Sequence, residues 1–121
     1  MAGLLAGASG ATAVPAPSEA KIASSHPASP NDFRKHYFNT VIDQWSHWTP
    51  NTRTDTHAGT LRAGTNYFYC WTFAQTYANN GHVSPYWLRT DDDSGNRNVW
   101  VSDVNLEEWA FQNDTRILPE C

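Results

Sequence analysis

The uneven placement of the aromatic residues constrains this chain more than any other feature. None of them precedes Phe33, and all 16 lie between that residue and the C-terminus. Aromatic side chains supply much of the apolar area that a small core buries, so a core is expected only within residues 33–121. That length suits one domain. We therefore predict a single folded domain over 33–121, preceded by segments that have no core of their own.

The first 13 residues resemble the end of a secretory signal peptide. They are small or apolar, and Ala11-Thr12-Ala13 matches the pattern at which signal peptides are cleaved. A complete signal carries a positive charge before its apolar stretch, whereas the first basic residue here is Lys21. We expect residues 1–13 to be a signal-peptide remnant and the protein to be secreted. The alternative is a flexible tail on a cytosolic protein.

Residues 14–32 are rich in proline, serine and alanine. Such a segment cannot bury enough apolar surface to offset the entropy of ordering it, so an extended tail is expected. An extended tail can add to the sheet edge of a partner protein through backbone hydrogen bonds. Because the prolines at 15 and 17 restrict strand pairing, the predicted partner-binding window follows them. Its residues are Ser18, Glu19, Ala20, Lys21, Ile22, Ala23 and Ser24.

The segment 32–48 carries two overlapping patterns. Phe33, Tyr37 and Val41 recur at helical spacing, but residues alternate between two faces from Val41 onward, as in a strand. The spacing slightly favours a helix, and the abundance of aromatic and β-branched residues favours a strand. On the residues alone, both readings stay open for 41–48.

Beyond Pro50 the sequence has the pattern of short strands separated by turns. The segment 66–74 is the most strand-like, and its two largely apolar faces predict a central strand covered on both sides. A loop over 75–84 with an Asn80-Gly81 turn, a strand over 85–90, a hairpin turn over 91–96 and a strand over 98–106 complete the pattern. The predicted fold class is all-β, as a small barrel.

The second half of this pattern resembles the bacterial SH3-type domain of small secreted actinobacterial proteins. The matching residues are Gly59, Leu61, Gly64-Thr65, Cys70, Trp87-Leu88, Gly95 and the Trp100–Asp103 stretch with its continuation to Leu106. The R-S-G-P-like turn of such domains is replaced here by the segment 48–51. The resemblance covers roughly 41–121 and implies an SH3-like barrel, a strand over 41–48 and a helix confined to 32–40.

The chain has two cysteines, Cys70 and Cys121. In a secreted domain of this kind, a bond between them would tie the C-terminal segment back across the barrel. It would close a loop of roughly 50 residues and stabilise the fold by about 4 kcal/mol on the chain-entropy model. Small exported domains commonly need such a bond. Two free thiols in a cytosolic protein are the alternative.

The residues predict neither catalysis nor a bound metal or cofactor. Cys70 is assigned to a disulfide and so is not a nucleophile. The acidic runs 91–93 and 107–108 are expected to be solvated turns, and the five histidines, expected at the surface and in loops, lack the spacing of zinc ligands. The scattered basic residues exclude a nucleic-acid footprint. No apolar run reaches the roughly 20 residues of a membrane span.

Six tryptophans exceed what a barrel of this size easily buries, so some are expected on an exposed face. The three predicted to bind a partner are Trp48, Trp87 and Trp109. Aromatic faces stack on sugar rings, which fits a cell-wall module that binds peptidoglycan or another glycan. They also dominate the cores of protein interfaces. The alternative to a binding role is that the tryptophans only cover the core.

We favour a secreted, non-enzymatic adaptor that docks a partner protein through its tail and an aromatic barrel face. The reason is that a cell-wall module usually accompanies a hydrolase, for which this chain has no room. The cell-wall module is the alternative function. By analogy only, umbrella-toxin particles of actinobacteria use adaptor subunits of about this size.

Overall fold

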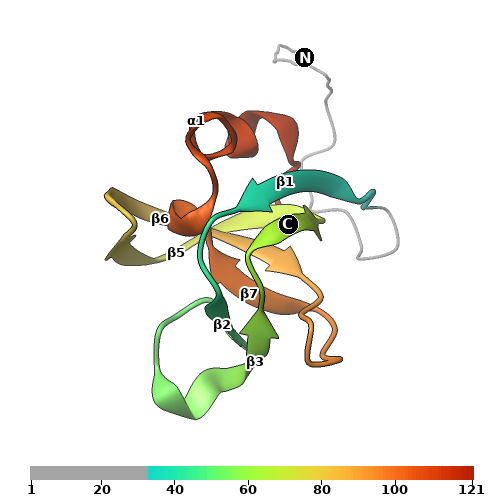
Figure 1. The fold of residues 1–121 in the computed structure, drawn as a ribbon, viewed down its shortest axis with the longest axis vertical. Helices are drawn as coiled ribbons and strands as arrows, with labels where there is room; N and C mark the ends of the chain where they lie inside the picture. The colour runs from blue at the N-terminus through green and yellow to red at the C-terminus, as the bar shows by residue number, and fades with distance from the viewer. Residues whose placement is uncertain (1–32) are drawn as a thin grey trace, which may run out of the picture.

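The computed structural model describes residues 33–121 of the chain (Figure 1). The predicted signal remnant at 1–13, the tail at 14–32 and the partner window within it lie outside the described residues. These three expectations therefore stay predictions.

The described part consists mostly of strands, with one α-helix near its end. The strands are β1 (His36–Thr40), β2 (Gln44–His47), β3 (His57–Leu61), β4 (Gly64–Phe68), β5 (Cys70–Asn79), β6 (His82–Thr90) and β7 (Val99–Ser102). The helix is α1 (Glu108–Ile117), and two 3-10 turns are η2 (Thr54–Thr56) and η3 (Asp103–Asn105). The helix is neither long nor apolar enough to cross a membrane.

The strands form two antiparallel sheets. One pairs β1 with β4, and the other has the order β3-β2-β7-β6-β5. The prediction of a mainly β fold is confirmed. The sheets do not close into a single barrel, because β3 and β5 remain edges of the larger sheet. The SH3-like arrangement stays a prediction.

The helix predicted over 32–40 is wrong, because its second half is the strand β1. All five residues of β1 pair with β4, from His36 opposite Phe68 to Thr40 opposite Gly64. Along β1 the side chains alternate between exposed and buried, with Phe38 and Thr40 facing inward. Pairing with a distant segment has therefore outweighed the local helical spacing. The strand expected over 41–48 is confirmed only in part, because β2 spans Gln44–His47.

The strand predicted over 66–74 is divided at Tyr69. The residues before it belong to β4, and those after it belong to β5, an edge strand rather than a central one. The break occurs where the Tyr69 backbone N–H donates to the carbonyl of Arg89 at 2.9 Å, which ties the end of β4 to β6. Phe68 and Cys70 are fully buried, whereas Phe73 is 67% exposed. The prediction that both faces are covered is correct only for the first half of the segment.

The turns of the second half fall where the sequence predicts them. Asn80 and Gly81 both have positive φ, 54° and 75°, and connect β5 to β6. The loop expected around them over 75–84 is mostly strand, because β5 and β6 extend almost to the turn. Residues 91–96 connect β6 to β7 as predicted.

The expectation that the aspartates of the 91–96 turn are solvated is correct only for Asp93, which is exposed. Asp92 is buried, and its carboxylate accepts hydrogen bonds from the Ser46 hydroxyl at 2.5 Å and from the backbone N–H groups of Ser94 and Asn96 at 2.9 Å. Burial alone would raise the pKa of Asp92, but these hydrogen bonds hold it below its ordinary value. This carboxylate anchors the turn against β2.

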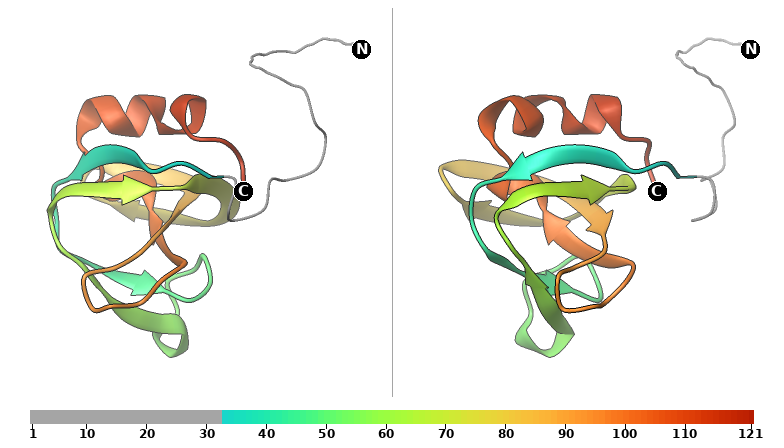
Figure 2. Two further views of the ribbon diagram at one scale, coloured as in Figure 1. Left: turned by 90° about the vertical axis from the view of Figure 1, so that its right-hand side faces the viewer. Right: turned by 45° about the vertical axis from the view of Figure 1, so that its right-hand side comes forward.

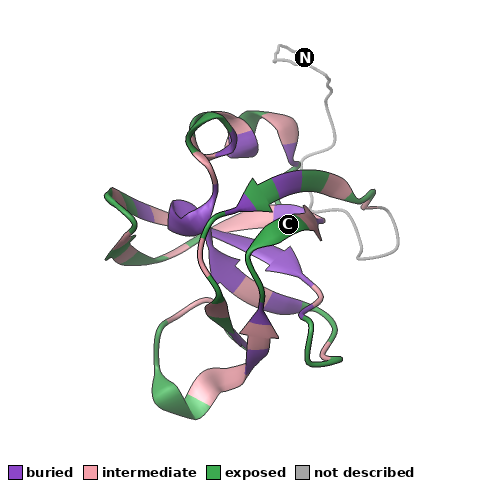
Figure 3. Ribbon diagram, viewed as in Figure 1, coloured by how far each residue is buried: buried purple, intermediate pink, exposed green. Residues whose placement is uncertain are grey.

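The core lies between the two sheets and α1. Figure 2 shows α1 across one end of the domain beside β1, with the β2–β3 pair at the other end. Figure 3 shows the buried residues concentrated where these layers meet. The main cluster consists of Phe38, Leu61, Phe68, Leu88, Val101, Leu106, Ala110 and Leu118.

The predicted disulfide is confirmed. Cys70 and Cys121 are bonded, with their Cα atoms 5.0 Å apart. The residues before Cys121 also lie along the start of β5. The Trp71 N–H donates to the Pro119 carbonyl at 3.0 Å, and the Cys121 N–H donates to the Trp71 carbonyl at 2.8 Å. The C-terminal segment thus covers the first part of an otherwise free sheet edge.

Candidate functional site

A groove of about 300 Å³ lies at the end of the larger sheet, next to the loop 48–56. This loop and the β2–β3 pair are at the end of the domain farthest from α1 (Figure 1). The side chains that line the groove are aromatic, amide, hydroxyl and acidic. They are Asp43, Gln44, Trp45, His47, Thr52, Tyr77, Asn79, Trp87, Ser102 and Asn105.

Trp45 supplies an accessible aromatic surface at the rim of this groove. It projects from β2, and 52% of its surface is exposed. Its ring stacks on the ring of His57 from β3, with the centroids 3.8 Å apart and the planes inclined by 12°. This stacking fixes the orientation of the indole without burying it.

Trp87 forms the base of the groove and is not on an exposed face. It lies in β6, inside the sheet, and only 2% of its surface is exposed. Its indole N–H donates to the Gln75 carbonyl at 2.7 Å, and the ring of His47 meets it edge-on at 6.2 Å. The prediction that Trp87 belongs to an exposed aromatic face is therefore wrong, because its side chain is packed inside the domain.

A chain of side-chain amides lines one wall. The Asn79 amide donates to the Asn105 oxygen at 2.9 Å, and the Asn105 amide donates to the Gln44 oxygen at 3.1 Å. The Gln44 nitrogen at the end of the chain is buried and has no partner among residues 33–121. The hydrogen bonds fix the three amides in position before any ligand is present.

His47 is buried, contrary to the expectation of a surface or loop histidine. Only 6% of its surface is exposed, and its Nδ1 atom lies 2.9 Å from the Thr56 hydroxyl. Burial, and then the neighbouring His57 ring, lower the pKa of His47. The imidazole is therefore neutral at neutral pH. Asp43, the one acidic side chain among the lining residues, is exposed. Its carboxylate accepts a hydrogen bond from the Ala63 backbone N–H at 2.8 Å.

Reciprocal hydrogen bonds hold the loop 48–56 against β5. The Thr52 backbone N–H donates to the Gln75 side-chain oxygen at 3.0 Å, and the Gln75 amide donates to the Thr52 hydroxyl at 2.9 Å. Both partners are exposed, so each hydrogen bond competes with water. Trp48 lies at the start of this loop with 51% of its surface exposed, but it does not line the groove.

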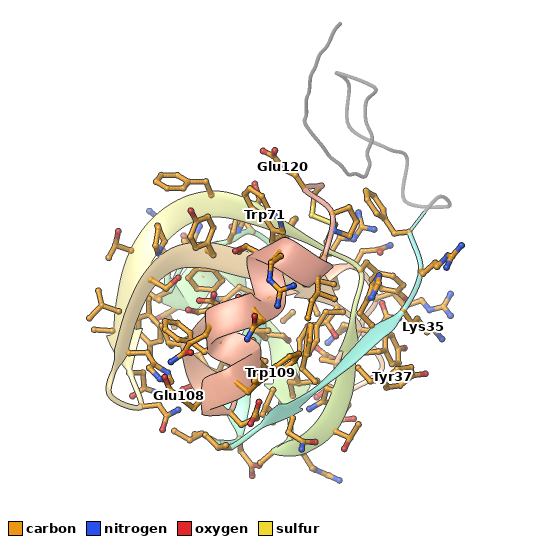
Figure 4. The ribbon with its side chains drawn as sticks, turned by 90° about the horizontal axis from the view of Figure 1, so that it is seen from above. Lys35, Tyr37, Trp71, Glu108, Trp109 and Glu120 are labelled. Carbon is orange, nitrogen blue, oxygen red and sulfur yellow. A yellow bond between two sulfur atoms is a disulfide. The ribbon has the colours of Figure 1, made fainter. Side chains whose placement is uncertain are left out.

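A second hollow, of about 360 Å³, lies between β1, β4 and α1. Tyr37 and Trp109, with 62% and 57% of their surfaces exposed, line it together with Asn39, Thr65 and Glu107. Figure 4 shows Trp109 on α1 and Tyr37 on the neighbouring β1. The three tryptophans predicted as one binding face are therefore separated, because Trp48 and Trp109 lie at opposite ends of the domain and Trp87 is buried.

The sequence interpretation missed Trp45 and the amides as site residues. A signal for Trp45 was present, because Asp43 and Trp45 alternate on one face of the strand over 41–48. By the same alternation His47 would join them. It does so, because His47 lines the groove with them, but it is buried there rather than exposed. The amides come from distant segments, so no local pattern could reveal them.

Within residues 33–121 no group of three or more His, Cys, Asp or Glu side chains is placed to hold a metal ion. The groove itself has one carboxyl group, that of Asp43. Comparison with protein-family models, with curated proteins and with solved structures gives no match to this chain.

Proposed function

We propose that this is a secreted, non-enzymatic protein that binds a saccharide in the groove beside Trp45. The observation that carries the proposal is a half-exposed indole, fixed flat on His57, next to a wall of prearranged amides. The face of an aromatic ring packs on the C–H face of a sugar. Nearby amide and carboxylate groups exchange hydrogen bonds with its hydroxyls. Ligand sites typically combine aromatic side chains with convergent polar groups, and this groove has both.

The size of the groove suits a small ligand. Its volume of about 300 Å³ is at the lower end of the roughly 300–1,000 Å³ found for ligand pockets. Such a volume matches one sugar ring or the end of a glycan chain rather than a long segment. The buried Trp87 and the hydrogen-bonded amides make the site rigid, so little ordering entropy is lost on binding.

The carboxyl content of the groove favours binding of a saccharide without hydrolysis. Glycoside hydrolysis ordinarily uses a pair of carboxyl groups on either side of the scissile bond. Asp43 is the single carboxyl among the lining residues, and His47 is held neutral inside the wall.

The disulfide supports a location outside the reducing cytosol. Cell-wall glycans, including peptidoglycan, are the saccharides that a secreted bacterial protein meets there. The resemblance to bacterial SH3-type domains points to the same class of ligand.

The test is a comparison of Trp45→Ala with Trp109→Ala in binding to purified cell walls and to soluble oligosaccharides. Sedimentation and calorimetry provide the readouts. We expect Trp45→Ala to weaken binding about tenfold or more, corresponding to roughly 1.4 kcal/mol of lost stacking. Trp109→Ala removes an equally exposed indole outside the groove and should bind as the parent does. Equal binding by both variants would exclude the groove as the site.

A secreted adaptor remains the second candidate, and the hollow between Tyr37 and Trp109 supports it. Exposed aromatic residues are enriched in protein interfaces. In that case Trp109→Ala, or removal of the predicted docking tail at residues 14–31, would abolish binding of a protein partner. Trp45→Ala would still bind that partner. The resemblance to adaptor subunits of toxin particles remains an analogy.

A further inference from the structure

Asp43 is the one charged side chain among the residues described around the groove. The other lining side chains are aromatic, amide or hydroxyl, apart from His47, whose lowered pKa leaves it neutral. The cation in the adjoining loop, Arg53, forms an ion pair with Asp55. The groove therefore carries a negative charge that no lining residue balances.

Two polar side chains of the groove, Asp43 and Asn79, present acceptor oxygens that no described residue pairs. One carboxylate oxygen of Asp43 accepts from the Ala63 N–H, and the second has no donor within residues 33–121. The Asn79 amide nitrogen donates to Asn105, whereas its oxygen has no donor in the same part of the chain. These atoms match ligand groups that donate hydrogen bonds, such as sugar hydroxyls and protonated amines.

A carboxylate or phosphate on a sugar would find no hydrogen-bond donor in these acceptor atoms. Such groups only accept hydrogen bonds, so they would leave the Asp43 and Asn79 oxygens unpaired. They would also place a like charge next to Asp43. Unpaired acceptors and like charges are the features by which binding sites reject a competing ligand.

We propose that the groove selects saccharides without carboxylate or phosphate groups and that Asp43 sets this selectivity. The inference rests on the proposed saccharide function. It makes the uncharged glycan of a cell wall, or one with free amines, the ligand class. Acidic wall polymers are excluded from the groove.

The experiment uses β-1,4-linked glucosamine hexamers that share one backbone and differ in charge. They are N-acetylated (neutral), free amine (cationic) or N-succinylated (anionic). Calorimetry with the full chain should give at least tenfold tighter binding of the neutral and cationic hexamers than of the anionic one, as expected for charge discrimination at close range. Asp43→Asn keeps the acceptor for Ala63 and should reduce the difference to about threefold or less. Glu120→Gln removes the same charge outside the groove and should leave it unchanged.

The possible outcomes separate the inference from the function beneath it. Equal or tighter binding of the anionic hexamer would overturn the selectivity, and an unaltered ratio in Asp43→Asn would overturn the role of Asp43. Trp45-dependent binding to cell walls without binding of the neutral hexamer would also overturn the inference, while the saccharide function stands. Absence of any Trp45-dependent binding to walls or hexamers would overturn both.

Discussion

Asp103 and Asp114 are two carboxyl groups inside the domain, each about 1% exposed, where η3 meets α1. Burial, and then the hydrogen bond and charge of Asp103, raise the pKa of Asp114 to about 9. Burial also raises the pKa of Asp103. One carboxyl of such a pair keeps its proton at neutral pH, because two adjacent charges away from water are strongly unfavourable.

Asp114→Asn should make the protein more stable at pH 8, with little difference from the parent at pH 4. The unfolded chain releases the Asp114 proton near the ordinary pKa of 3.8, but the folded chain keeps it up to about 9. The folded state therefore binds more protons between these values, and the free energy of unfolding falls as pH rises through this window. Asparagine, neutral at every pH, removes that loss.

Melting temperatures of the two proteins from pH 4 to pH 9 provide the measurement. Glu120→Gln, at an exposed carboxyl, serves as the control and should follow the parent. A constant difference between Asp114→Asn and the parent across this range would show that Asp114 does not hold a proton in the folded state.

The strand β3 and the 91–96 turn pack so closely that one position between them has no room for a side chain. A Cβ atom at Gly59 would lie 2.6 Å from the Cβ of Ser94 and 2.7 Å from a carboxylate oxygen of Asp92. The same contact carries hydrogen bonds, since the Gly59 N–H donates to the Ser46 hydroxyl at 2.9 Å and the Asp93 N–H donates to the Thr60 carbonyl at 2.9 Å.

Gly59→Ala should lower the free energy of unfolding by about 1–3 kcal/mol, the usual cost of forcing an extra methyl group into a packed contact. The backbone and the Asp92 network would have to move apart to admit it. Urea denaturation checks this result, with Ala63→Ser at an exposed position as the matched control. A variant as stable as the parent would mean that the turn separates from β3 at no cost.

The turns were the part of the structure that the sequence predicted best. The Asn80-Gly81 and 91–96 turns depend on residues that are adjacent in sequence, and both were located correctly. The region 32–40 was not, because β1 is determined by its pairing with β4. The paired residues are 24 to 32 positions apart, from Thr40 opposite Gly64 to His36 opposite Phe68. The site was predicted least well. Exposure of Trp45 and burial of Trp87 depend on strand order, which no local pattern contains.

The aromatic distribution predicted a core within residues 33–121, but it did not predict which aromatic side chains lie at the surface. Phe38 and Phe68 meet in the core, with ring centroids 6.0 Å apart, as the clustering of aromatics after residue 33 indicated. The disulfide adds to this small core by joining Cys70 to Cys121. It fixes the C-terminal segment to β5 after α1 has crossed the end of the domain.

Cys121→Ser should lower the melting temperature markedly. The bond closes a loop of roughly 50 residues, and its loss costs up to about 4 kcal/mol on the chain-entropy model. Differential scanning calorimetry measures the change. The parent protein under reducing conditions is the matched comparison and should melt with the variant. An unchanged melting temperature in Cys121→Ser would remove the argument that this bond supports the fold.

The same bond determines how the domain would respond to a pulling force applied between Phe33 and Cys121. The load passes directly from Cys121 to Cys70, so β5, β6, β7 and α1 carry none of it along their backbone. Only residues 33–70 could be extended, a length of at most about 130 Å. The start of β1 lies opposite the end of β4, so their hydrogen bonds would break one after another, like a zip, at low force. A single-molecule trace would show this short extension, and a reductant would lengthen it.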